Sequence, residues 1–81
     1  MNLYLISQNK NESYDTYDSA IVAAKSKKEA LMIHPKGIKD WDGKKDSSGL
    51  WTSAKNVNVK KIGVAIMGAT KGVVLASYNA G

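Results

Sequence analysis

The chain contains no cysteine, arginine or phenylalanine. Without cysteine the fold cannot be held by disulfide bonds, and thiolate metal sites and cysteine nucleophiles are excluded. A chain of 81 residues buries only about 60% of the surface that its unfolded form exposes. We therefore expect one small domain over residues 1–81 that depends on packing alone, or on packing together with self-association.

Long apolar runs are also lacking. The longest are short stretches such as GVVLAS, far below the roughly 20 residues that cross a bilayer as a helix. The opening MNLYLISQ has neither the basic region nor the small-residue cleavage site of a secretory signal. We therefore expect a soluble protein that stays in the cytoplasm and does not bind membranes.

The basic residues are all lysines, and their excess over acidic residues gives a formal net charge of +5. Arginine offers a planar fork for bidentate contacts to phosphate or guanine, whereas lysine is a hydrated point charge. Diffuse attraction is therefore expected rather than base-specific readout, although AT-rich coding explains a lysine-only set equally well. Residues 25–61 carry ten lysines against four acidic residues, a local charge of +6.

Residues 1–7, MNLYLIS, predict a strand that is apolar on both faces. Successive side chains of a strand alternate, so Leu3 and Leu5 point one way while Tyr4 and Ile6 point the other. A strand with two apolar faces suits the centre of a sheet.

The strongest local signal is a helix start. Ser26 and Glu29 fit a capping box, in which the Ser26 hydroxyl accepts from the Glu29 amide and the Glu29 carboxylate reaches back to the Ser26 amide. Pro35 disfavours helix at His34, so the helix should end near there after about two turns. A helix this short is not stable alone and must dock on a sheet.

Residues 57–66 alternate like a strand, but the phase shifts by one residue before Ile62, beside Gly63, which predicts a β-bulge. Further strands are expected over residues 19–24 and 73–78, and the last two strands should form an antiparallel hairpin. The order strand, strand, helix, strand, strand predicts an α+β fold, with an antiparallel sheet of about four strands and one short helix.

Two short motifs suggest ligands but fit poorly. Gly63 and Gly68 have the spacing of a phosphate loop, yet Ala69 stands where the lysine is required, so a turn is the better interpretation. Asp40 and Asp42 have the spacing of the first two EF-hand ligands, but lysines occupy the following positions and would repel the cation. Asp42-Gly43 is instead expected to form a turn. We expect no metal and no cofactor.

His34 is the only histidine, and histidine is a residue type that acts as a general base or as a ligand. It precedes Pro35 at the expected helix end, where a structural role is the simpler interpretation. No serine or threonine lies in a recognisable nucleophile motif. We therefore expect that the protein is not an enzyme.

Both tryptophans fall in the glycine-punctuated, lysine-rich stretch GIKDWDGKKDSSGLW. The favoured interpretation is that both plug the core, since two indoles contribute several kcal/mol to a small fold, on the order of their buried area. In the alternative, one indole is exposed among lysines and either stacks a nucleobase or anchors a protein interface. The candidate partner-binding residues are Trp41, Trp51, Lys36, Lys39, Lys44, Lys45, Lys60 and Lys61.

Several longer motifs span nearly all of the chain: NLYLISQ, YDTYDSAIVAA, IHP, a tryptophan before VNVKKIG, and GVVLASYNAG. In this pattern the chain resembles a group of short, uncharacterised proteins of phages and prophages. The resemblance implies a small protein that acts by binding, for example by blocking a host defence complex as anti-CRISPR proteins do. The basic charge departs from the strongly acidic inhibitors that mimic nucleic acid, which points to an acidic protein face or to nucleic acid as partner.

The sequence thus leads to the expectation of a non-enzymatic binding protein of a phage or mobile element. It would occlude a working surface of a host protein or complex through residues 36–61, with charge steering the encounter. The alternative is a non-specific nucleic-acid-binding module that uses the same lysine and tryptophan surface. A monomer, or a homodimer that pairs an edge strand such as residues 73–78, fits either function.

Overall fold

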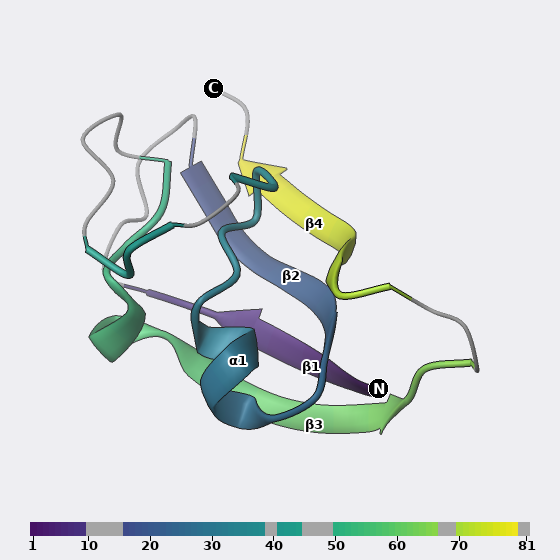
Figure 1. The fold of residues 1–81 in the computed structure, drawn as a ribbon. Helices are drawn as coiled ribbons and strands as arrows, with labels where there is room; N and C mark the ends of the chain where they lie inside the picture. Colours follow the sequence, from purple (N-terminus) through teal and green to yellow (C-terminus); the bar gives the residue numbers. More distant parts are fainter. Residues whose placement is uncertain (10–15, 39–40, 45–49, 67–69, 80–81) are drawn as a thin grey trace.

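The computed structural model describes residues 1–9, 16–38, 41–44, 50–66 and 70–79. Its elements are β1 (Asn2–Ser7), β2 (Thr16–Ala24), α1 (Lys27–Leu31), the 3₁₀ helix η1 (Ala54–Asn56), β3 (Asn58–Val64) and β4 (Gly72–Asn79) (Figure 1). The predicted α+β class and the order of strands and α-helix are confirmed.

The four strands form one sheet in the order β3-β1-β2-β4, and every neighbouring pair is antiparallel. The predicted central position of β1 is therefore confirmed. The predicted hairpin between the last two strands is wrong, because β3 pairs with β1 and β4 with β2, on opposite edges of the sheet. The β1–β2 pair has one unpaired edge on each side. β3 pairs with the edge of β1, and β4 pairs with the edge of β2.

The predicted bulge beside Gly63 is present. The register between β1 and β3 shifts between Leu3, which pairs with Gly63, and Tyr4, which pairs with Lys61. Ile62 is the extra residue on β3. A bulge of this kind increases the local twist, which lets the end of β3 follow the curved sheet.

The start of α1 matches the sequence prediction in one half of the capping box. The Ser26 hydroxyl accepts from the Glu29 amide at 3.2 Å. The other half is different, because the Glu29 carboxylate accepts from the Lys25 amide at 3.1 Å instead of the Ser26 amide. With five residues, α1 is also shorter than the two turns expected.

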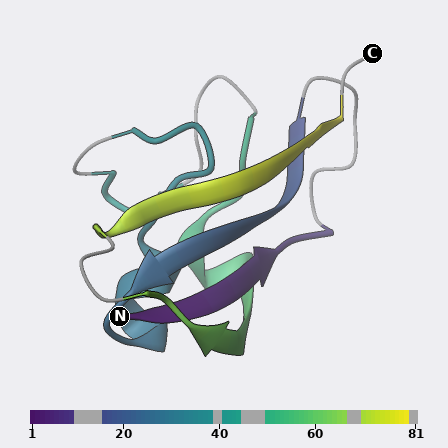
Figure 2. The ribbon, with the colours of Figure 1, turned by 90° about the vertical axis from the view of Figure 1, so that its right-hand side faces the viewer.

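The core lies between one face of the sheet and the segments that follow β2. Figure 1 shows α1 over this face, whereas Figure 2 shows the strands with α1 behind them. The core residues are Tyr4, Ile6, Ala20, Val22, Ala24, Ala30, Ile33 and Trp51. No helix among the described residues covers the opposite face.

Replacing the capping residue should weaken the fold measurably. We expect Ser26→Ala to lower the free energy of unfolding by about 1 kcal/mol, because the Glu29 amide loses its acceptor. For a domain of this size that corresponds to a fall in Tm of about 4–8 °C in thermal unfolding followed by circular dichroism.

Ser53→Ala is the matched control, since Ser53 precedes η1 but its side chain caps no backbone amide. An equal loss of Tm for the two variants would contradict the role assigned to Ser26.

Candidate functional site

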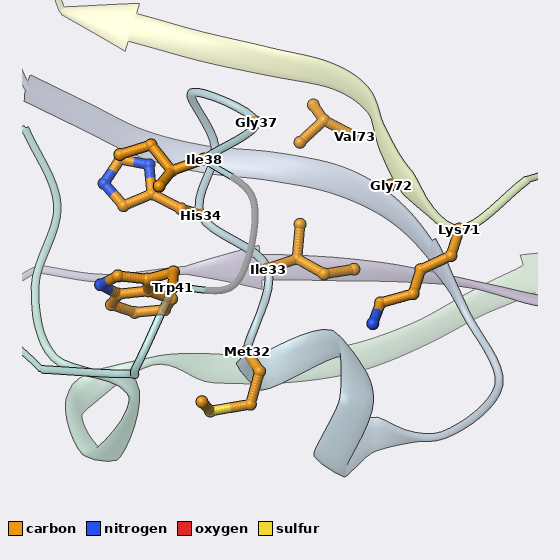
Figure 3. Close-up of a pocket in the computed structure, with 9 residues that line it drawn as sticks. All are labelled: Met32, Ile33, His34, Gly37, Ile38, Trp41, Lys71, Gly72 and Val73. Atoms are coloured by element: carbon orange, nitrogen blue, oxygen red, sulfur yellow. The ribbon is translucent and has the colours of Figure 1, made fainter.

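A cleft of about 460 Å³ opens on the helix side of the sheet, between the end of α1 and the start of β4 (Figure 3). Its walls come from two segments that lie far apart in the sequence. The lining residues are Met32, Ile33, His34, Gly37, Ile38, Trp41, Lys71, Gly72 and Val73. Among these described residues Lys71 is the one lysine, and the described lining contains no carboxylate.

His34 organises the turn that forms one wall. Its side chain is fully buried, its Nδ1 accepts from the Lys36 amide at 3.1 Å, and its carbonyl accepts from the Gly37 amide at 2.8 Å. Gly37 has a φ of 83°, which favours glycine. The hydrogen bond to Nδ1 leaves Nε2 to carry the proton of the neutral ring. These contacts support the predicted structural role of this histidine.

Trp41 is half-buried in the same wall and is held at both its ring and its polar atom. Its ring meets that of His34 edge to face, with centroids 5.4 Å apart and an interplanar angle of 87°. Its Nε1–H donates to the Lys44 carbonyl at 3.0 Å. Trp41 is therefore presented to the cleft in one fixed orientation.

A tight turn after Trp41 supports this arrangement. The Asp42 carboxylate accepts from the Lys44 amide at 3.0 Å, and Gly43 has a φ of 80°. This positive φ favours glycine, and a Cβ at Gly43 would also lie 3.1 Å from the end of the Met32 side chain, which would have to shift slightly. The predicted Asp-Gly turn is confirmed, and Asp42 serves it as a backbone acceptor.

Trp51 does not line the cleft. It lies on the segment that precedes η1 and is fully buried in the core against the sheet. Trp51 therefore packs in the core, as the favoured interpretation expects, and it is not a surface anchor. Its Nε1 finds no acceptor among the residues that the structure describes. A buried donor without a partner costs about 1–3 kcal/mol, which the packing of the large indole offsets.

Those proposed lysines that the structure describes do not form one surface. Lys36 and Lys44 are exposed on the segment that carries Trp41. Lys60 and Lys61 are consecutive on β3 and point to opposite faces of the sheet, since they pair with Leu5 and Tyr4. Lys39 and Lys45 lie outside the described residues.

Lys71 is the cleft residue that sequence reasoning missed. It lies thirty positions beyond Trp41 in the numbering and directly before β4, and Figure 3 shows its side chain extending toward the cleft from the wall opposite Trp41. No local pattern marks it. It reaches the cleft because β4 pairs with β2, which the predicted β3–β4 hairpin did not anticipate.

The described part of the chain contains no group of three or more His, Asp or Glu residues arranged to hold a metal ion. In the same residues, no helix is long and apolar enough to cross a bilayer. A comparison of the chain with protein-family models, with curated proteins and with solved structures finds no match. The candidate binding site is the cleft, which is lined by apolar and aromatic side chains and by Lys71.

The two tryptophans should differ sharply in their contribution to stability. We expect Trp51→Ala to lower the free energy of unfolding by about 3–5 kcal/mol, because it leaves a large cavity in a small core. Trp41→Ala should cost clearly less, since that ring is only half-buried. Urea unfolding followed by circular dichroism measures both values.

Trp51→Phe is the matched variant, since it keeps an aromatic ring and removes the unpaired N–H. It should cost less than Trp51→Ala. Equal losses of unfolding free energy for Trp41→Ala and Trp51→Ala would contradict the difference in burial between the two rings.

Proposed function

We propose that the protein is a non-enzymatic binding protein whose cleft receives an apolar side chain of an acidic partner protein. Binding would cover a working surface of that partner and block it sterically. The observation that carries this proposal is the half-buried Trp41, held in one orientation in a cleft lined by apolar side chains and by Lys71.

The cleft has the composition of an interface centre. Tryptophan is enriched among residues that dominate binding energy, and methionine adapts its shape to the group it contacts. Met32 and Ile38, which are both exposed, lie beside Trp41. Because Trp41 is already held by the Lys44 carbonyl and by His34, little side-chain entropy is lost when a partner binds it.

The charge around the cleft favours an acidic partner. Lys36, Lys44 and Lys71 are exposed on the segments that form its walls, and the whole chain carries a net charge of +5. Complementary charge raises the association rate and rejects basic surfaces, while the apolar contact in the cleft supplies most of the affinity.

The resemblance to phage and prophage proteins makes a host defence complex, such as a CRISPR effector, the first partner to test. An inhibitor of such a complex acts in the cytoplasm of the host cell. The alternative function, non-specific binding of nucleic acid, also uses lysines beside an aromatic ring. The two functions are distinguished by comparing what the protein captures from lysate with and without nuclease treatment.

Capture from host lysate should depend on Trp41. We expect the tagged protein to retain a partner protein after nuclease treatment, and Trp41→Ala to weaken binding by at least about tenfold, because a central aromatic anchor contributes about 2 kcal/mol or more. The measurement is pull-down at two salt concentrations, followed by titration of the purified partner. Ile66→Ala is the control, since Ile66 is 83% exposed and does not line the cleft.

Loss of all captured material on nuclease treatment would favour the nucleic-acid-binding module instead. A partner retained equally by Trp41→Ala and by the wild type would place the contact surface outside the cleft.

A further inference from the structure

The two edge strands of the sheet, β3 and β4, differ in how well their sequences protect them against pairing with another chain. An edge strand presents unpaired backbone N–H and C=O groups, and proteins usually guard such an edge with lysine, proline, a bulge or a short strand. β3 carries two exposed lysines, Lys60 and Lys61, and its bulge lies beside Gly63. β4, with the sequence GVVLASYN, has neither a charged residue nor a proline over its eight residues.

One irregularity interrupts β4 near its start. The register with β2 shifts between the Val73 and Leu75 pairs, which leaves Val74 as an extra residue. The rest of the strand, Leu75–Asn79, continues to pair with β2, with a second register shift between the Ser77 and Tyr78 pairs that leaves Asp18 of β2 as the extra residue. On its other side this stretch has no strand beside it in the described sheet, and it lies beyond the residues of β4 that line the cleft.

The side chains at this edge are also apolar and exposed. Val74 is 62% exposed and Leu75 is 64% exposed. Leu75 pairs with Ile21 and lies with Leu5 around a shallow hollow on the sheet face that α1 does not cover. Within the described sheet, β4 therefore has a strand on one side only, and Val74 and Leu75 are exposed.

We propose that β4 is a self-association edge, at which two copies of the chain pair their β4 strands antiparallel about a two-fold axis. The result is one continuous sheet of eight strands. This surface is separate from the cleft, and pairing through Leu75–Asn79 leaves Lys71, Gly72 and Val73 free to line it.

A second copy fits β4 better than the acidic partner proposed for the cleft. β4 carries no charge, so pairing it with itself sets no like charges opposite one another, and it offers no lysine to an acidic chain. Pairing β3 with itself would bring Lys60 and Lys61 close to their own copies. A β3–β4 contact would not close and would continue as a filament, whereas a two-fold β4–β4 contact closes.

The geometry of the pairing gives distances that can be tested. If the axis passes through the middle of Leu75–Asn79, the two Ser77 Cα atoms lie about 5 Å apart. The two copies of β3 are then separated by seven strand spacings, or about 34 Å. Because the chain has no cysteine, a single introduced thiol reports one position without interference.

The first experiment is sedimentation of the wild type, Leu75→Lys and Ile66→Lys over a range of concentrations. We expect a concentration-dependent dimer for the wild type and for Ile66→Lys, the same kind of change at an exposed residue outside β4. Leu75→Lys should be shifted toward monomer by at least about tenfold in dissociation constant, because it puts a lysine into the uncharged pairing edge of each copy, and lysine on an edge strand opposes pairing with another chain. Circular dichroism checks that each variant is folded.

The second experiment compares Ser77→Cys with Lys60→Cys after oxidation with oxidised glutathione, which takes up the two electrons released by the paired thiols. We expect a covalent dimer of Ser77→Cys and little of Lys60→Cys, because both positions are exposed but only the former lies at the axis. A wild type that stays monomeric to about 1 mM would overturn the proposal. So would a dimer that survives Leu75→Lys, or preferential cross-linking at position 60.

Discussion

Burial of Trp51 against the helix side of the sheet is the interaction on which the rest of the structure depends. Helix α1, the one α-helix among the described residues, has five residues and reaches the sheet with few side chains, among them Ala30. Trp51 supplies the missing volume, and the Leu50 carbonyl fixes its segment by accepting from the Tyr17 amide at 2.9 Å. In a chain without disulfides, packing of this kind is the main source of stability.

Little of the described chain covers either face of the sheet, and this explains both surfaces to which we assign binding. On the helix side the short helix and the turn after Pro35 leave a cleft, with the half-buried Trp41 in its wall. On the other side no described helix covers the sheet, and β4 ends it without charge or proline. A partner at the cleft and a second copy at β4 would occupy different parts of the molecule, so a dimer would present two clefts.

Much of the fold follows from the sequence. The two apolar faces of residues 1–7 predict a central strand, the phase shift beside Gly63 predicts the bulge, and Ser26 predicts the helix start. The candidate site was only partly predictable. The sequence singles out Trp41 among lysines, but it gives no reason to group this residue with Lys71 or to separate it from Trp51.

What the sequence alone determined about this protein is local: the strands, the cap at Ser26, the bulge beside Gly63 and the Asp42–Gly43 turn. Each of these depends on side chains and backbone groups within a few residues of one another. The tertiary structure decided which edge β3 and β4 occupy, which indole is buried and which lysine reaches the cleft. The two free edges of the β1–β2 pair offer the same backbone groups, so only the packing of the whole chain distinguishes between them.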